Sequence, residues 1–149
     1  MKNGRQGGFL IARIHQAAGR IFAKKLKEYN LQEINPAQGR ILFVLWEKDG
    51  IPIQELARKT SLGKSTLTSM LDRLEESGHV RRTPSEDDRR TIIITLTESD
   101  KKLRGVYNKV SDEMTELFYR GLSARDVDVF EQNLERVLGN LEKAEKENA

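Results

Sequence analysis

Two short helical patterns joined by a turn at residues 60–63 limit what this chain can fold into more than any other feature. The first pattern covers residues 53–59, and the second runs from Lys64 to Ser77. In the second pattern apolar residues recur at i, i+3, i+4 and i+7, which predicts a helix with one buried face. These residues are Leu67, Met70, Leu71 and Leu74. Two helices connected by so short a turn are typical of a helix-turn-helix.

The outer face of the second helix begins with one lysine and four hydroxyl side chains. No acidic residue lies between Lys64 and Leu71. In a helix-turn-helix this part of the second helix commonly enters the major groove of DNA. A lysine can bind phosphate or guanine, and hydroxyl groups can contact bases or phosphate. The candidate DNA-facing residues are therefore Lys64, Ser65, Thr66, Thr68 and Ser69. An ordinary solvated helix shows the same pattern, so the two helices alone leave both interpretations open.

A predicted β-hairpin directly after these helices favours DNA binding. Two β-branched runs, residues 80–83 and 91–96, bracket a charged turn. Such a hairpin is a wing, and Arg89 and Arg90 near its tip could reach phosphates or a narrow minor groove, whose negative potential attracts arginine. The alternative is a charged, exposed turn. Asp88, next to both arginines, is interpreted as a structural brace rather than a DNA-facing group.

A buried helix is expected before the helix-turn-helix. Asn35 can cap its start, Pro36 suits its first position, and Gln38 completes a capping box. The helix should extend to Lys48, because apolar residues occupy most of its sides. Trp46 is interpreted as a core residue rather than a binding residue.

Long amphipathic helices are expected on both sides of residues 36–96. One covers residues 9–29, and two more lie within residues 98–146, after capping-box patterns that begin at Thr97 and Ser123. A single chain has too little surface to cover their apolar stripes, whereas a two-fold interface with a second copy would bury them. A homodimer could place its two recognition helices about 34–36 Å apart, which is one turn of DNA. We therefore predict a pseudo-palindromic binding site.

These motifs, in this order and spacing, resemble the MarR family (multiple antibiotic resistance regulators) of winged-helix transcription factors, and the likeness covers nearly the whole chain. The matching segments are Glu55-Leu56-Ala57, Lys64-Ser65-Thr66-Leu67-Thr68, Asp72-Arg73-Leu74-Glu75, Ser77-Gly78, and Asp88-Arg89-Arg90 followed by Leu96-Thr97. The resemblance implies a mainly α fold with a small β-wing, in a single domain over residues 1–149. Residues 36–96 would form the winged-helix unit, and residues 9–29 and 98–146 the dimerisation helices.

The resemblance also implies a repressor that binds double-stranded DNA as an obligate homodimer. It adds Arg73 to the DNA-facing helix residues, assigns Arg89 and Arg90 to DNA contacts, and implies that Asp88 holds a wing arginine. Many members bind a small phenolic or aromatic anion, so a small-molecule effector is an expected partner, with no pocket residues assigned. Two features depart from the family pattern: Asp100 stands near a position where many members have glycine, and Glu86 and Asp87 place acids in the wing, which would blunt its approach to DNA.

Composition excludes several other classes of protein. The net charge of +3 is only mildly basic and does not by itself predict nucleic-acid binding. There is no cysteine, which excludes a thiol-based sensor, disulfides and cysteine zinc sites. No apolar run approaches the length of a membrane span, so a cytoplasmic protein without membrane contact is expected.

The sequence contains no recognisable catalytic pattern. The only histidines, His15 and His79, are far apart, and the glycine-rich phosphate loop of nucleotide-binding enzymes is missing. We expect neither enzyme activity nor a metal or other cofactor. Two alternatives to a specific regulator stay open: an architectural protein that binds any DNA sequence, and a protein-interaction module that has lost DNA binding, which the acids in the wing would suit.

Overall fold

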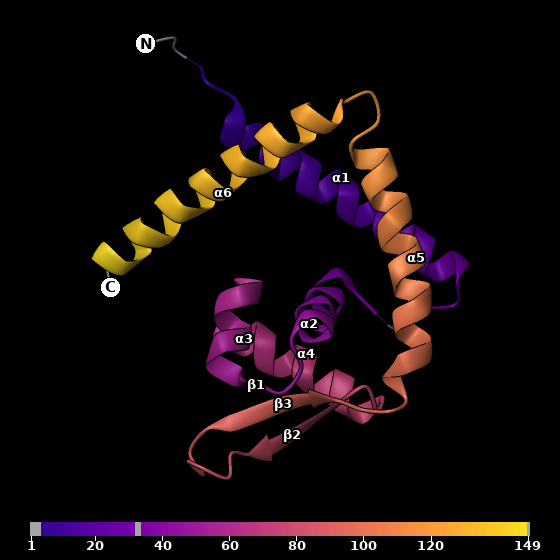
Figure 1. Ribbon diagram of the computed structural model, residues 1–149, viewed down its shortest axis with the longest axis vertical. Coiled ribbons are helices and arrows are strands. Elements are labelled where there is room, and N and C mark those ends of the chain that lie inside the picture. The colour runs from indigo at the N-terminus through magenta and orange to yellow at the C-terminus, as the bar shows by residue number, and fades with distance from the viewer. Residues whose placement is uncertain (1–3, 32–33, 149) are drawn as a thin grey trace. The chain divides into compact units, whose positions relative to one another are not determined.

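The structure is a computed structural model that describes residues 4–31 and 34–148, apart from the side chains at positions 101 and 102. The chain forms two compact units, Met1–Ser111 and Asp112–Ala149. Figure 1 labels the elements in chain order, and the predicted fold class, mainly α with a small β-wing, is confirmed. None of the helices in the described ranges combines the length and the hydropathy that a bilayer crossing requires.

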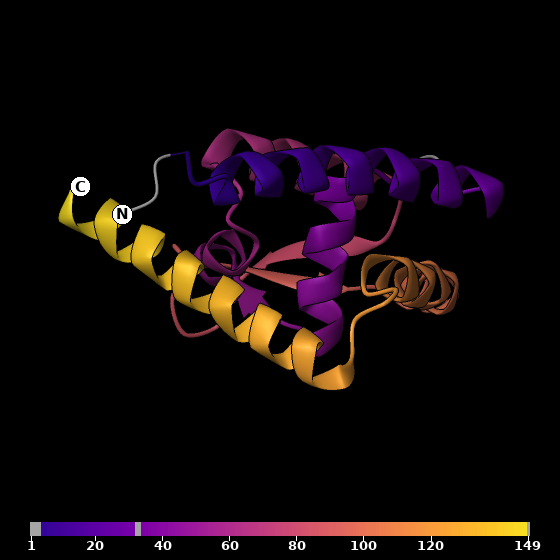
Figure 2. The same ribbon diagram turned by 90° about the horizontal axis from the view of Figure 1, so that it is seen from above.

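Helices α1 (Gly7–Glu28) and α2 (Pro36–Glu47) come first, and α2 provides the centre of the core. Its predicted capping box is confirmed: the backbone N–H of Gln38 donates to Oδ1 of Asn35 at 2.8 Å, and the N–H of Asn35 donates to Oε1 of Gln38 at 2.7 Å. Fully buried side chains on α2 are Ile41, Leu42 and Leu45. Figure 2 shows α2 running across α1, which it contacts.

An aromatic cluster joins α1 and α2 to the first half of α5 (Asp100–Phe118). The ring of Tyr107 on α5 meets Phe22 of α1 edge-on, with centroids 5.4 Å apart, and Trp46 of α2 at 4.8 Å. Edge-to-face contacts of this kind are favoured by the ring quadrupoles. A Cβ at Gly39 would collide with the hydroxyl group of Tyr107, so glycine at this position permits the close approach of α2 and α5.

The helix-turn-helix consists of α3 (Ile53–Thr60) and α4 (Lys64–Glu76), close to the predicted ranges. The buried face of α4 carries Leu67, Leu71 and Leu74. In the turn, Ser61 adopts the left-handed conformation with φ of 57°. Nη1 of Arg40 donates to the carbonyl oxygen of Thr60 at 3.1 Å. This hydrogen bond ties the turn to α2 and satisfies one carbonyl at the end of α3.

The sheet has three strands rather than the two that the sequence pattern predicts. Strands β2 (Val80–Pro84) and β3 (Ile92–Leu96) form the expected hairpin, and β1 (Ile51–Pro52) pairs with the other edge of β3. All pairs are antiparallel, and Ile94 of β3 lies opposite both Ile51 and Arg82. The expectation of a two-stranded ribbon was incomplete, because two residues are too few to show the alternation by which strands are recognised.

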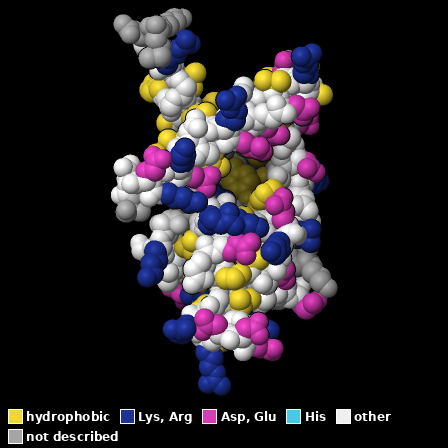
Figure 3. Space-filling model, turned by 60° about the vertical axis from the view of Figure 1, so that its left-hand side comes forward, with side chains coloured by type: hydrophobic (Ala, Val, Ile, Leu, Met, Phe, Trp, Pro, Cys, Tyr) yellow, Lys and Arg dark blue, Asp and Glu magenta, His cyan; other side chains and the backbone are white. Residues whose placement is uncertain are grey.

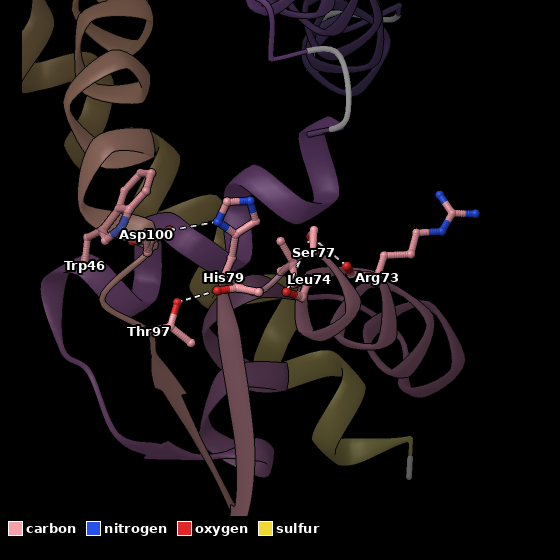
Figure 4. Close-up of polar contacts among 8 residues, drawn as sticks. Trp46, Arg73, Leu74, Ser77, His79, Thr97 and Asp100 are labelled. Atoms are coloured by element: carbon pink, nitrogen blue, oxygen red, sulfur yellow. Dashed lines mark hydrogen bonds and ion pairs between the residues drawn. The ribbon is translucent and has the colours of Figure 1, made fainter.

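The capping box predicted from Thr97 to Asp100 is wrong. Helix α5 begins only at Asp100, and the hydroxyl group of Thr97 donates to the carbonyl oxygen of Gly78 at the end of α4 (Figure 4). The Asp100 carboxylate is buried instead: its Oδ2 accepts a hydrogen bond from Nε1 of Trp46 at 2.5 Å, and its Oδ1 lies 3.8 Å from Nδ1 of His79. Asp100 thus gives the indole N–H of Trp46 a buried polar partner.

The second unit contains the end of α5 and α6 (Ala124–Glu147). Its predicted capping box is confirmed, since the N–H of Asp126 donates to Oγ of Ser123 and the N–H of Ser123 donates to Oδ2 of Asp126, each at 3.1 Å. The hydroxyl group of Tyr119 donates to Oε2 of Glu131 at 2.6 Å. Partial burial, together with this hydrogen bond, raises the pKa of Tyr119 to about 12. None of the side chains along α6 is buried.

Candidate nucleic-acid interface

The exposed face of α4 carries the predicted contact residues at its N-terminal half. Lys64, Ser65, Thr68 and Ser69 line one shallow, open groove of about 480 Å³, together with Asp72. They share a face because they are spaced one and two turns apart along the helix, opposite the buried leucines. The structure therefore brings together four of the six predicted helix residues. Thr66 is exposed but is not among the residues that line the groove.

Arg73 is exposed one position beyond Asp72. In Figure 4 its side chain extends away from the contacts among Trp46, His79 and Asp100. Its backbone carbonyl accepts a hydrogen bond from Oγ of Ser77 at 2.8 Å, while the guanidinium group makes no ion pair with any described residue. The positive charge of Arg73 is thus available to a partner near the C-terminal half of α4.

The hydroxyl groups in the groove differ in what they can offer to a ligand. Oγ1 of Thr68 donates to the carbonyl oxygen of Lys64 at 2.9 Å, so it presents mainly lone pairs to the outside. Ser65 and Ser69 form no side-chain hydrogen bond with another described residue, and each can donate or accept. A surface that combines one cation with adaptable hydroxyl groups suits contacts to both phosphates and base edges.

The acid in this groove, Asp72, was not among the predicted site residues. Its Oδ1 lies 2.7 Å from Nη2 of Arg82 on β2, and the same nitrogen lies 2.8 Å from Oε1 of Glu75. The hydrogen bond from the side chain of Arg82 is the main reason that the pKa of Glu75 is lowered, and the bond to Glu75 is the main reason that the pKa of Arg82 is raised. Helical spacing from Ser65 and Ser69 could have placed Asp72 in the groove, but no sequence pattern pairs it with Arg82.

The tip of the wing presents both predicted arginines to solvent. Oδ1 of Asp88 accepts a hydrogen bond from the backbone N–H of Arg90 at 3.0 Å and lies 3.4 Å from its Nε. Arg89 shows no such contact with the residues that the structure describes. In Figure 3 basic and acidic side chains stand next to each other at the lower end, where Figure 1 places the β2–β3 turn. The structure thus brings Asp88 together with Arg90 and leaves Arg89 exposed.

A helix-turn-helix followed by a hairpin wing defines a winged-helix protein. The model of the MarR family matches residues 34–92. The uncharacterized HTH-type transcriptional regulator YfiV of Bacillus subtilis (strain 168) is 34% identical over 110 residues, which cover 66% of this chain and 69% of that protein. The chain belongs to the MarR family, as its motifs predict, and it is therefore a transcriptional regulator and not an enzyme.

Two solved structures extend the comparison to nearly the whole chain. A mutant of MarR from E. coli, crystallised in complex with operator DNA, is 28% identical with a TM-score of 0.76, over 88% of this chain and 92% of that one. A MarR transcriptional regulator from Methanosarcina mazei Go1 is 27% identical with a TM-score of 0.79, over 92% of this chain and 96% of that one. The similarity thus includes the terminal helices as well as the residues that the family model matches.

Proposed function

We propose that this protein is a repressor that binds a pseudo-palindromic operator as a homodimer. Helix α4 enters the major groove, and the wing contacts the minor groove. The proposed DNA contacts are Lys64, Ser65, Thr66, Thr68, Ser69, Arg73, Arg89 and Arg90, with Asp88 holding the wing. The observation that carries this proposal is the open groove on α4, where a lysine and three hydroxyl side chains stand together over a buried leucine face.

The complex of the E. coli relative with operator DNA supports binding of operator DNA by this chain. In helix-turn-helix proteins the N-terminal residues of the second helix commonly contact base edges, and this is the part of α4 that the groove occupies. The acids of α4 begin at Asp72, so the first two turns of the helix offer no repulsion to phosphates.

Exposed apolar side chains on the terminal helices support the homodimer. On α1 they are Phe9, Leu10, Ile11, Ile14 and Ile21, and on α6 they are Val129, Val137, Leu138 and Leu141. Large apolar side chains exposed on a helix commonly mark a protein interface, and homodimers are usually two-fold symmetric. In the proposed domain of residues 1–149, residues 36–96 bind DNA, while residues 9–29 and 98–146 hold the two copies together.

A small aromatic or phenolic anion is the proposed effector, in line with the resemblance to the family. It would act by binding one arrangement of the dimer more tightly than the other, because a ligand with equal affinity for both arrangements shifts nothing. Titrating phenolic acids into the DNA complex tests this part separately, and loss of the complex at a saturating concentration is the expected result.

Footprinting of genomic fragments tests the main proposal. A specific repressor protects a palindromic sequence well above background, whereas an architectural protein binds all fragments alike with strong salt dependence. A protein-interaction module protects nothing even at low salt. Protection of a palindrome supports the proposal, and either of the other results overturns it.

Two substitutions assign the contacts once an operator is known. Ser69→Ala should change the preferred base at one position of each half-site, because it removes a hydroxyl from the groove. Arg90→Ala should weaken binding to all sequences, because it removes a charge from the wing tip. Gln54→Ala and Arg58→Ala, at exposed positions on α3 outside the proposed DNA contacts and the proposed dimerisation helices, serve as controls. Equal losses on every sequence from Ser69→Ala would contradict its role in base recognition.

A further inference from the structure

The ion pairs of Arg82 connect the two elements that form the proposed DNA interface. Its guanidinium group reaches from β2 to two carboxylates on α4, Asp72 at 2.7 Å and Glu75 at 2.8 Å. The backbone N–H of Arg82 also donates to the second oxygen of Glu75 at 3.2 Å. Glu75 thus binds the main chain and the side chain of one strand residue, an arrangement that fixes both position and orientation.

Arg82 is held firmly on its own side of this contact. It lies in the middle of β2, paired with Ile94 of the central strand, and Ile94 is fully buried. Its side chain is 26% exposed, against 52% for Asp72 and 40% for Glu75. The guanidinium group is therefore the least exposed of the three charged groups and belongs to a residue fixed by strand pairing.

The position of Asp72 gives this contact a consequence for DNA binding. Asp72 lines the same groove as Lys64, Ser65 and Ser69, where a phosphate or a base edge would lie. An uncompensated carboxylate there would repel the DNA backbone, and Glu75 stands one turn further along the helix. Isolated ion pairs on a surface contribute little to stability. For DNA binding, the neutralisation of the two carboxylates by Arg82 therefore matters more than the stability that the ion pairs add.

We propose that Arg82 is a positioning residue of the DNA interface: it neutralises Asp72 and Glu75 and holds the wing against α4, without itself touching DNA. This inference rests on the proposed function, because it concerns the same DNA-binding surface. It accounts for how α4 carries acids next to its contact residues and still presents a surface that DNA can approach.

A double-mutant cycle on the full-length protein tests the inference, with the dissociation constant for an operator fragment as the readout. Arg82→Gln should weaken binding tenfold or more in the wild-type background. In the Asp72→Asn/Glu75→Gln background the same substitution should weaken binding less than threefold, because no carboxylates are left to neutralise. An effect of equal size in both backgrounds would show that Arg82 acts on DNA directly and would overturn the inference, as would a loss below threefold in the wild type.

Arg81→Gln is the matched control, since Arg81 precedes Arg82 on β2 and forms no ion pair with a described residue. Its effect, whatever its size, should be the same in both backgrounds. Should Arg82→Gln melt below the assay temperature, Arg82→Lys enters the same cycle, because it keeps the charge but loses the paired geometry. Failure of the wild-type protein to bind any fragment would defeat the proposed function, whereas equal losses in a protein that binds DNA defeat this inference alone.

Discussion

The winged-helix unit and the last helix, α6, use their apolar side chains in opposite ways. In the winged-helix unit, Leu45 on α2, Leu71 on α4 and Ile94 on β3 are completely buried. On α6, by contrast, Leu138 is 49% and Leu141 is 59% exposed. Burial of apolar surface stabilises a fold by about 25 cal/mol per Å². The first region thus buries apolar side chains within one chain, while α6 leaves apolar surface exposed, which the proposed second copy would cover.

Of the substitutions that test this difference, removal of a buried leucine from the winged-helix unit should change the free energy of unfolding most. Leu71→Ala is expected to lower the free energy of unfolding by about 2–5 kcal/mol, because it leaves a cavity in a packed core. Phe43→Ala truncates a side chain that is 48% exposed on α2, and it should cost less than about 1 kcal/mol. Denaturant unfolding at fixed protein concentration measures both, and equal losses would contradict the difference in burial.

A charge on the apolar face of α6 should separate the two copies while each chain stays folded. Leu138→Glu is expected to weaken dimerisation tenfold or more, about 1.4 kcal/mol or above, because an unpaired carboxylate is costly to bury. Sedimentation equilibrium measures the dissociation constant, and Gln132→Glu on the same helix is the control for charge alone. A wild-type protein that stays monomeric at micromolar concentration would contradict the proposal that a second copy covers the apolar face of α6.

A capping box starts α2 and another starts α6, so the two caps can be compared directly. Asn35→Ala at the start of α2 and Ser123→Ala at the start of α6 should each lower stability by about 1 kcal/mol, because a backbone N–H loses its acceptor. Thermal unfolding measures the loss, and Asn35→Asp and Ser123→Asp, which keep a capping oxygen, should largely restore it. Loss at only one of the two sites would show that the other helix is held by packing alone.

The smallest expected effect is a pH dependence that comes from Asp100. Burial raises its pKa above the ordinary value of 3.8, although the hydrogen bond from Trp46 and the charges of His79 and Arg104 act the other way. Since the folded state binds this proton more tightly than the unfolded state, stability should fall as pH rises from the ordinary value through the raised one, and then level off. Wild-type melting temperatures from about pH 3 to 7 contain this fall together with the opposite contribution of Glu75, whose pKa is lowered, so the Asp100 contribution is measured as a difference between variants.

Asp100→Asn isolates this contribution, because asparagine keeps the acceptor for Trp46 and stays neutral. The difference in melting temperature between the variant and the wild type should grow with pH through the same window and then stay constant. Asp128→Asn, at an exposed position on α6, is the control for replacing a carboxylate with an amide. A constant difference for Asp100→Asn would mean that burial does not alter this carboxyl group.

Patterns that lie close together in the sequence predicted most of the fold. The capping boxes at Asn35 and Ser123 and the leucine spacing of α4 are local features, and the structure confirms all three. Strand β1 escaped detection because a strand of two residues shows no periodicity. The capping box at Thr97 failed because tertiary contacts took both polar groups: Gly78 binds the threonine, and Trp46 binds Asp100.

The surface of α4 could be predicted from sequence only in part. Spacing along a helix identifies which residues share a face, and it correctly groups Lys64, Ser65, Thr68 and Ser69. It cannot show that Arg82, ten residues after Asp72, returns on a strand to neutralise the acid on that face. Contacts between a helix and a strand depend on how the hairpin turns back, which the local pattern does not encode.

Because Trp46 is hydrogen-bonded to Asp100, the intrinsic fluorescence of Trp46 can report on this part of the protein. Trp46 is the only tryptophan in the chain, and its indole N–H is bound at the point where the wing ends and α5 begins. Its emission responds to the electric field of the neighbouring carboxylate. Spectra of the unlabelled protein can therefore follow events at this junction, with no dye attached.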